Sequence, residues 1–243
     1  MTALRSLVFQ ALFWGWTAFL AFLFLPLVVL PRGVIVGCGS WWSRSVLWLL
    51  RCVVGLNHRI EGRGNVPAGP VLWAIKHQSA WDTLIVPVLI DDPVVVLKRE
   101  LLWIPLYGWL ARRHGMIGID RNSGARALRA MVAAAERAIA AGRSIVVFPE
   151  GTRTPPGERR PYHSGIAALY TRLGVPVVPV ALNSGLFWGR RAFTRKPGTI
   201  TLRILPPIPP GLDRRTFMAR LEHAIETESK ALVAHPDGPA QGR

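Results

Sequence analysis

The fold of this chain is decided by the stretch Val71-Leu72-Trp73-Ala74-Ile75-Lys76-His77-Gln78-Ser79-Ala80-Trp81-Asp82. Its first half is an uninterrupted apolar run, which is typical of a buried strand in a parallel sheet. A polar turn follows and places the imidazole of His77 and the carboxylate of Asp82 near the start of the next helix. Sites in such sheets lie beyond the carboxyl ends of the strands. The stretch therefore predicts a central strand with a functional site directly after it.

Strand and helix patterns alternate on both sides of this stretch. Helical periodicity is clearest over Ser123–Ala141, with Ser123 as a candidate N-cap and Gly142 just past the end, and over Asp213–Ala234. This alternation predicts an α/β fold with a largely parallel central sheet of about seven strands, covered by helices. Short apolar runs bounded by turn residues predict the strands His58–Glu61, Val71–Ile75, Val94–Leu97, Met116–Ile119, Ile145–Phe148, Val177–Ala181 and Ile200–Leu205.

The N-terminal segment is strongly apolar. No residue from Ser6 to Pro31 carries a formal charge, and a membrane-spanning helix needs roughly 20 such residues. A second apolar stretch, Val34–Leu56, is interrupted by Arg44 and Arg51. A signal peptide and a core helix of a soluble domain are the competing interpretations. We predict an N-terminal hydrophobic helical membrane anchor: a spanning helix followed by an interfacial one, or, with a break at Pro26, a hairpin within one leaflet.

The arginines around this segment predict its orientation. Arg5 precedes the apolar run, whereas a group of arginines follows it, namely Arg32, Arg44, Arg51, Arg59 and Arg63. Because positive residues favour the cytoplasmic side, we expect the main body to face the cytoplasm, at the inner membrane if the protein is bacterial. The predicted parts are a membrane-associated helical segment (1–56), an α/β domain (57–235) and a disordered tail (236–243).

The composition indicates an anionic partner. The 243 residues include 30 Lys and Arg against 14 Asp and Glu, which gives a formal net charge of +16. Nucleic acid, a phospholipid surface or a phosphorylated substrate would suit this charge. Hydrophobic residues make up 50% of the chain and there are 10 Trp, which favours a membrane lipid over nucleic acid. Only Cys38 and Cys52 are present, so the sequence has no disulfide framework and no thiol cluster for zinc.

His77 and Asp82 are candidate catalytic residues. Gln78 or Ser79 is placed to start the following helix, so Asp82 falls in the first turn and can turn back toward His77. A carboxylate in that position fixes the tautomer of the imidazole and leaves the other ring nitrogen as a base. An N-capping carboxylate beside a purely structural histidine is the alternative interpretation.

Three further blocks lie beside other predicted strands. Phe148-Pro149-Glu150-Gly151-Thr152-Arg153-Thr154 combines a glycine that permits close backbone approach with an arginine whose planar fork matches phosphate oxygens. We expect Glu150 to orient that arginine or a nearby backbone amide. Lys98–Trp109 begins with basic residues that suit the same anion and continues with apolar residues that suit an acyl groove or a bilayer. Val175–Leu182 contains Pro179, which predicts a strand edge or a bulge.

In this order and spacing, the four blocks resemble those of the glycerolipid acyltransferases, in particular the 1-acylglycerol-3-phosphate (lysophosphatidate) acyltransferases. The resemblance covers about Val71 to Leu182, and a hydrophobic N-terminus also suits the family. It implies that His77 is the general base and that Asp82 orients it.

The resemblance also implies a binding site for the phosphate of the acceptor. That site would comprise Lys98 and the turn formed by Glu150, Gly151, Thr152 and Arg153. One departure stands downstream, where family members often have a lysine before a glycine. This chain has Tyr162-His163-Ser164-Gly165 there, so this loop supplies no lysine at that position.

The implied activity is transfer of an acyl chain from acyl-CoA or acyl carrier protein to the free hydroxyl of lysophosphatidate, giving phosphatidate in phospholipid biosynthesis. The expected partners are a phospholipid membrane, the lysophospholipid acceptor and the acyl thioester; we expect no nucleic acid, no bound cofactor and no metal. The sequence contains no G-x-S-x-G, which disfavours a serine hydrolase. The alternatives are another lysolipid acceptor, such as lyso-ornithine lipid, and a non-catalytic basic protein that binds anionic lipid or nucleic acid.

Overall fold

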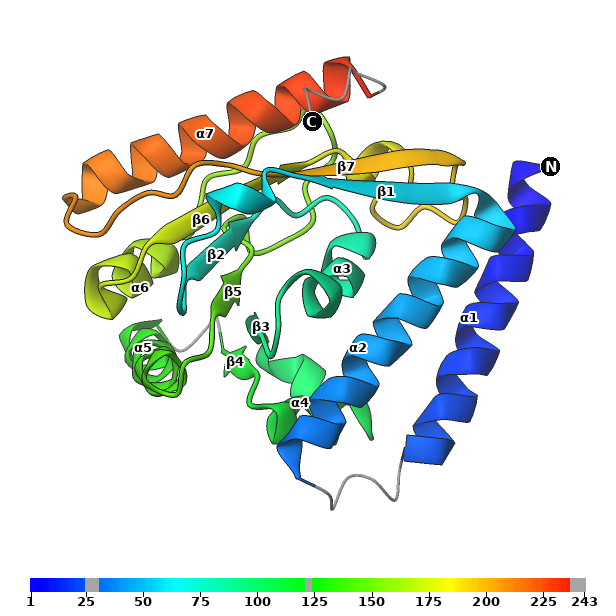
Figure 1. Cartoon of the computed structure of the whole chain (residues 1–243), viewed down its shortest axis with the longest axis horizontal. Coiled ribbons are helices and arrows are strands. Elements are labelled where there is room, and N and C mark those ends of the chain that lie inside the picture. Colours follow the sequence, from blue (N-terminus) through cyan, green and yellow to red (C-terminus); the bar gives the residue numbers. More distant parts are fainter. Residues whose placement is uncertain (25–30, 121–123, 237–243) are drawn as a thin grey trace.

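The computed structural model describes residues 1–24, 31–120 and 124–236. Its centre is a seven-stranded sheet of order β1-β7-β6-β2-β5-β3-β4 (Figure 1), in which all neighbours are parallel except β6 and β7. This confirms the predicted fold class, and each strand ends within two residues of its predicted bounds. The strands are β1 (Leu56–Glu61), β2 (Leu72–Ile75), β3 (Val94–Lys98), β4 (Ile117–Ile119), β5 (Ile145–Val147), β6 (Val177–Leu182) and β7 (Gly198–Ile204).

Helices connect and cover these strands. The α-helices are α1 (Thr2–Phe24), α2 (Arg32–Leu49), α3 (Trp81–Leu89), α4 (Tyr107–His114), α5 (Gly124–Ala140), α6 (Gly165–Leu173) and α7 (Arg214–Ala234). Short turns of other helix types are the π-helix η2 (Leu50–Val54) and the 3-10 helices η3 (Arg63–Asn65), η4 (Arg99–Trp103) and η5 (Ser184–Leu186). The two helices that the sequence predicts most clearly are α5 and α7.

The ends of these two helices match their predicted signals where the structure describes them. Gly142 follows α5 in the left-handed conformation, φ 75°, which ends a helix at little steric cost. Asp213 caps α7, because its side chain accepts hydrogen bonds from the backbone N–H groups of Arg215 and Thr216. The proposed N-cap Ser123 lies outside the described residues, as does the predicted disordered tail beyond Pro236.

Strand β2 shows why the sheet has a helical layer on each face. Its four residues are all buried, and successive side chains of a strand point to opposite faces. Trp73 and Ile75 belong to a core shared with α1, α2 and α3. Leu72 and Ala74 belong to a second core shared with α5, α6 and α7. In Figure 1 these two sets of helices lie on opposite sides of the sheet. The continuous apolar run therefore reflects a strand that is covered on both faces.

Pro179 does not mark an edge strand. Strand β6 lies between β7 and β2, so the edge interpretation is wrong. On the β7 side, Val177 bridges Ile208 and Val180 pairs with Ile204. One strand advances from 177 to 180 while its partner advances from 204 to 208, so the partner carries an extra residue, as in a bulge. The missing N–H of Pro179 falls where the ladder is already interrupted.

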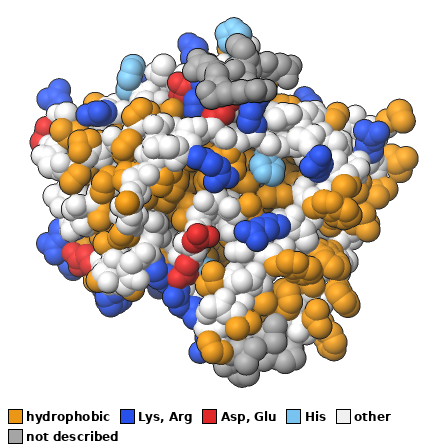
Figure 2. All heavy atoms as spheres, in the orientation of Figure 1, with side chains coloured by type: hydrophobic (Ala, Val, Ile, Leu, Met, Phe, Trp, Pro, Cys, Tyr) orange, Lys and Arg blue, Asp and Glu red, His pale blue; other side chains and the backbone are white. Residues whose placement is uncertain are grey.

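Helices α1 and α2 run side by side in opposite directions along one side of the molecule (Figure 1). Two indole N–H groups join them: Trp16 donates to the hydroxyl of Ser45 at 2.8 Å and Trp42 donates to that of Thr17 at 3.2 Å. Within the described ranges, α1 is the one helix that is long and apolar enough to cross a membrane, by length and composition. Hydrophobic side chains gather over this pair in Figure 2. The break predicted at Pro26 lies outside the described residues.

A buried arginine fastens α1 to the body. The guanidinium of Arg195 donates to Gln10 Oε1 at 2.5 Å and lies over the ring of Trp188, 4.6 Å from its centroid. The backbone N–H of Arg195 donates to the hydroxyl of Ser6 at 2.9 Å. Beside it, the ring of Phe9 is fully buried. The first turns of α1 therefore share a core with the α/β body, and the predicted boundary at 56/57 falls at the start of β1.

Candidate functional site

Four neighbouring strands bring the predicted blocks to one edge of the sheet. The sheet order places β6, β2, β5 and β3 side by side and parallel. His77 follows β2, and its ring stacks on that of Phe148, which follows β5, with the ring centroids 4.2 Å apart. The backbone N–H of Thr154 donates to the carbonyl oxygen of His77 at 2.7 Å. Residues some seventy positions apart are thus held in direct contact, as expected for the carboxyl ends of parallel strands.

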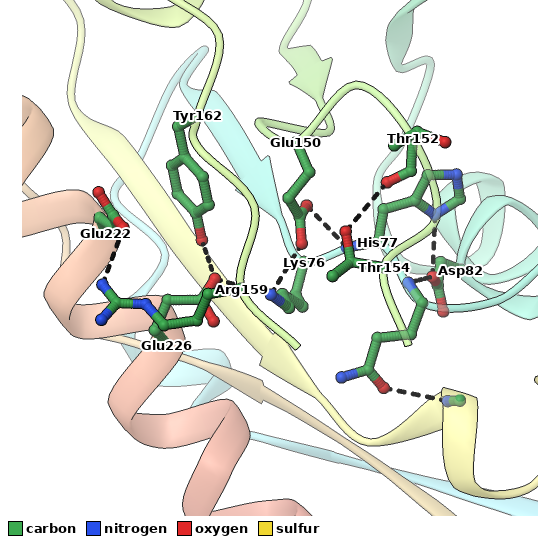
Figure 3. Close-up of polar contacts among 12 residues, drawn as sticks. Lys76, His77, Asp82, Glu150, Thr152, Thr154, Arg159, Tyr162, Glu222 and Glu226 are labelled. Carbon is green, nitrogen blue, oxygen red and sulfur yellow. Dashed lines mark hydrogen bonds and ion pairs between the residues drawn. The ribbon is translucent and has the colours of Figure 1, made fainter. Parts of the chain in front are cut away.

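His77 and Asp82 form a hydrogen-bonded pair (Figure 3). The Nδ1 atom of His77 lies 3.0 Å from Oδ2 of Asp82. The same carboxylate oxygen accepts the backbone N–H groups of Gln78 at 2.6 Å and Ser79 at 2.8 Å. Because a carboxylate that accepts these backbone hydrogen bonds acts as an acceptor toward the imidazole as well, Nδ1 carries the proton of the pair. The Nε2 atom is then left with the lone pair that a base requires.

Ser184 is a partner of this pair that the sequence does not reveal. It begins η5, just after β6, and its hydroxyl donates to Oδ1 of Asp82 at 2.5 Å. A second contact joins the same two segments, since the backbone N–H of Gly185 donates to Gln78 Oε1 at 3.0 Å. Ser184 is 102 positions from Asp82, and a single serine carries no motif. Only the adjacency of β6 and β2 brings the two together.

Behind His77, a buried ion network runs from β2 to α7 (Figure 3). The ammonium of Lys76 lies 2.8 Å from Glu150 Oε1 and 2.7 Å from Glu226 Oε1. Glu226 also accepts the phenolic hydroxyl of Tyr162 at 2.8 Å. Burial, together with the two nearby carboxylates, raises the pKa of Tyr162, so the phenol stays protonated and donates. The network therefore ties the residue before His77 to the C-terminal helix.

Glu150 is placed differently from the phosphate-binding role that the resemblance implies. Its side chain is buried, and its Oε2 accepts the backbone N–H of His77 at 3.1 Å while Oε1 faces Lys76. Burial raises the pKa of the Glu150 carboxyl, and the Lys76 ammonium opposes that shift. A buried carboxylate directed at Lys76 is unsuited to binding a phosphate, so we propose a positioning role for Glu150 instead. Of the two roles considered for it, orienting a backbone amide fits the geometry.

The other predicted residues line a single cavity. Lys98, Gly151, Thr152 and Arg153 all contact it, together with His77. Gly151 adopts φ 63°, a left-handed conformation that favours glycine at this tight turn. Lys98 is half exposed and pairs with Glu100 at 2.9 Å.

The cavity is also lined by polar residues that the predicted motifs did not include. Arg190 and Arg191 reach it from the loop after η5. From the departing Tyr162–Gly165 block, His163 and Ser164 also line it, whereas Tyr162 turns inward to Glu226. The two arginines and Arg153 give this cavity a basic lining, which suits an anionic group.

The cavity has a volume of about 1240 Å³, and apolar residues line it as well as basic ones. Apolar residues come from α1 and α2 on one side and from η4, α4 and α5 on others, among them Leu20, Phe24, Ile35, Leu110 and Leu128. Lys, Arg and His side chains surround hydrophobic ones near the middle of the face in Figure 2. The cavity therefore combines a histidine base, cationic groups and apolar surface, which are the features that a lipid with an anionic head requires.

Comparison with known proteins assigns the chain to a family. A family model described as "Acyltransferase" matches residues 57–183, from β1 to the end of β6. The chain belongs to this acyltransferase family. The matched range contains both members of the His77–Asp82 pair and the turn after β5.

Individual relatives of this acyltransferase support the same assignment. It is 33% identical over 210 residues to a 1-acyl-sn-glycerol-3-phosphate acyltransferase of Pseudomonas aeruginosa, covering 84% of this chain and 80% of that protein. It is 30% identical over 198 residues to the lyso-ornithine lipid O-acyltransferase of the same organism, covering 73% and 75%. Its fold resembles the crystal structure of the 1-acyl-sn-glycerophosphate (LPA) acyltransferase PlsC from Thermotoga maritima, with TM-score 0.81, 21% identity and coverage of 99% and 100%.

The ion network generates a prediction about Glu226, which touches His77 only through Lys76 and Glu150. We expect Glu226→Ala to lower kcat roughly 10- to 100-fold with little change in either KM, because a displaced base is costly even when binding is intact. Glu226→Gln should recover much of the rate, since its amide oxygen can still accept from Tyr162 and Lys76. Steady-state kinetics of acyl transfer would measure this.

Glu222→Ala is the matched control for Glu226→Ala. Glu222 lies one turn earlier on α7 and pairs with the exposed Arg159 at 2.8 Å. We expect its loss to leave kcat unchanged. If both variants lowered the rate equally, or if Glu226→Ala acted through KM alone, the positioning role of the network would be wrong.

Proposed function

We propose that this acyltransferase transfers an acyl chain from a thioester, acyl-CoA or acyl carrier protein, to the free hydroxyl of 1-acylglycerol 3-phosphate, giving phosphatidate. The observation that carries the proposal is the placement of His77. Its Nδ1 is hydrogen-bonded to Asp82, and its ring lines a cavity that is also lined by Arg153 and by extensive apolar surface. Relatives named 1-acyl-sn-glycerol-3-phosphate acyltransferase support the reaction.

In the proposed mechanism, Nε2 of His77 takes the proton of the acceptor hydroxyl as its oxygen attacks the thioester carbonyl. The imidazolium that forms is stabilised by Asp82. When the tetrahedral intermediate collapses, the carbon–sulfur bond breaks, and the imidazolium returns its proton to the departing thiolate. The products are an ester and a thiol, and His77 is again neutral. Direct attack needs no acyl-enzyme, and the cavity holds both the base and room for acyl chains.

Positively charged residues favour a phosphorylated acceptor. Arg153, in the turn after β5, lines the cavity together with Lys98, Arg190 and Arg191, and guanidinium groups bind phosphate oxygens in a bidentate manner. A lyso-ornithine lipid is the alternative acceptor, since a relative with that name is 30% identical. An ornithine head carries a carboxylate beside its amino cation and so has no net charge, whereas the head of lysophosphatidate is a net anion. The cationic lining of the cavity therefore favours lysophosphatidate.

We further propose that helices α1 and α2 hold the protein at the membrane as a hairpin and that the body faces the cytoplasm. With 23 residues, α1 is about 35 Å long, enough for a hydrocarbon layer of about 30 Å. However, Ser6 and Phe9 near its start are buried against the body. The antiparallel arrangement with α2 therefore favours a hairpin over an isolated spanning helix. Orientation rests on the arginines that follow α1.

The proton chemistry predicts the effects of changing His77 and Asp82. We expect His77→Ala to abolish detectable transfer and Asp82→Asn to reduce kcat by roughly 10³- to 10⁴-fold, since an amide can stabilise the wrong tautomer. Ser184→Ala removes one donor to Asp82 but leaves the His77–Asp82 hydrogen bond, so it should lower kcat much less. Activity assays with circular dichroism would separate chemistry from folding. Substantial activity of folded His77→Ala would rule out His77 as the base.

The phosphate site predicts a selective effect of Arg153→Ala. We expect the KM for lysophosphatidate to rise at least about tenfold, because one charge-assisted contact is worth roughly 1.5–3 kcal/mol, while the KM for the acyl donor stays unchanged. Arg160→Ala is the matched control, as Arg160 is exposed and does not line the cavity. An unchanged acceptor KM in Arg153→Ala would argue against phosphate contact.

A further inference from the structure

Large exposed hydrophobic side chains are confined to a few segments of the described chain. Many lie on α1 and α2, as a membrane hairpin requires. Beyond residue 48, those that the structure describes are Leu101, Trp103, Ile104, Tyr107, Trp109 and, on its own, Phe193. Trp103 is 61% exposed and Trp109 is 55% exposed. Single exposed apolar residues are ordinary, but a contiguous group marks an interaction surface. We call Trp103, Ile104, Tyr107 and Trp109 the α4 patch.

The backbone of this segment holds the α4 patch outward. Leu106 adopts φ 63° and ψ −58°, and the N–H of Tyr107 donates to the carbonyl of Pro105 at 2.7 Å. This γ-turn is rare and strained for a leucine, so the surrounding structure must enforce it. Gly108 then approaches Leu102 so closely that an added Cβ would lie 2.0 Å from its carbonyl oxygen. The exposure of the aromatic rings is therefore built into a fixed turn.

The segment has two sides with different surroundings. Leu101, Leu106 and Leu110 line the cavity, whereas Trp103, Ile104 and Trp109 do not. Tyr107 lies at the border, since it lines the cavity and is also 47% exposed. Helix α4 contacts α2, and in Figure 1 it lies beside the N-terminal end of that helix. The α4 patch is thus close to the hairpin, and the apolar part of the cavity lies between the two elements. A bilayer that receives the end of the hairpin would also meet the α4 patch.

We propose that the α4 patch is a second membrane-contact element, which inserts its aromatic rings into the interfacial region of the same leaflet as the hairpin. Tryptophan and tyrosine favour this region, because their rings are apolar and their N–H or O–H groups remain hydrated. The basic side chains of Arg99, Arg112 and Arg113 are exposed on the same segment, where they suit anionic head groups. Arg99 also lies over the ring of Trp103, 5.5 Å from its centroid.

A second copy of the chain fits this surface less well than a bilayer does. A two-fold dimer would place the α4 patch against itself. Arg112, which is exposed three residues after Trp109 on the same helix face, would then lie near Arg112 of the other copy, and the like charges would repel. Anionic lipids instead neutralise them. The charge around the α4 patch therefore favours a lipid surface.

Site-directed fluorescence would test the proposal in the full-length protein. In a Cys38→Ser, Cys52→Ser background, a nitrobenzoxadiazole label is attached to Trp103→Cys, and the protein is reconstituted with phosphatidylcholine–phosphatidylglycerol vesicles. Trp14→Cys on the exposed side of α1 and Ala219→Cys on the exposed side of α7 serve as reference positions. Emission wavelength reports polarity, and lipids with a nitroxide on the acyl chain report contact with the bilayer.

We expect the label at position 103 to behave like that at 14, with emission shifted to shorter wavelength and a loss of intensity with the nitroxide lipid, while the label at 219 shows neither. The proposal would be overturned if the label at position 103 behaved like that at 219. It would also be overturned if emission at 103 shifted without quenching by the nitroxide lipid, as contact with a second copy would cause. The inference rests on the proposed action on membrane lipids. The labels report only the position of the segment. A negative result would therefore overturn the α4 patch as a membrane contact and leave the proposed acyl transfer untouched.

Discussion

The carboxylate of Asp82 is the interaction on which the site depends. It accepts hydrogen bonds from two backbone amides in the turn before α3, from the imidazole of His77 and from the hydroxyl of Ser184. One buried group thus fixes the turn between β2 and α3, orients the base and joins the segments that follow β2 and β6. Each donor left without it would cost about 1–3 kcal/mol in this buried setting. Asp82 is not the N-cap of α3, which is Ala80 without a side-chain hydrogen bond. A structural and a catalytic role for Asp82 are nevertheless compatible, because the carboxylate that holds the backbone of the turn before α3 also orients the histidine.

A buried ion network centred on Lys76 supports the His77–Asp82 pair. An unpaired Lys76 would be strongly destabilising at this depth, so at least one carboxylate partner is needed, and Glu150 remains when Glu226 is replaced. Glu150 uses its other oxygen to hold the N–H of His77, and Glu226 brings α7 into the arrangement. His77 is consequently positioned by Lys76 after β2, Glu150 after β5 and Glu226 on α7. The arginines that line the cavity are not part of this network: Arg153 comes from the turn after β5, and Arg190 and Arg191 come from the loop after η5.

The sequence predicted the sheet well, because its strands are short apolar runs separated by turn signals and their burial follows directly from that pattern. It also predicted that His77 and the turn after β5 would meet, since parallel strands bring their carboxyl ends together. Ser184, Glu226 and Arg195 could not be found in this way. Each acts through one contact made across the fold, and local patterns carry no information on such pairs. The sequence left the role of Glu150 open between binding phosphate and orienting a backbone amide, because a motif does not show which way a side chain points.

The apolar cavity connects this chemistry to the membrane, since it is lined by the α1–α2 hairpin and α4 as well as by His77. Its basic residues bear on the central question, which lipid receives the acyl chain. The most direct measurement gives the purified full-length enzyme an isotopically labelled acyl thioester and an equimolar mixture of lysophosphatidate, lyso-ornithine lipid and lysophosphatidylcholine, and identifies the products by mass spectrometry. We predict that the label appears chiefly in phosphatidate. Label chiefly in ornithine lipid, or no transfer from either acyl-CoA or acyl carrier protein, would contradict the proposed function.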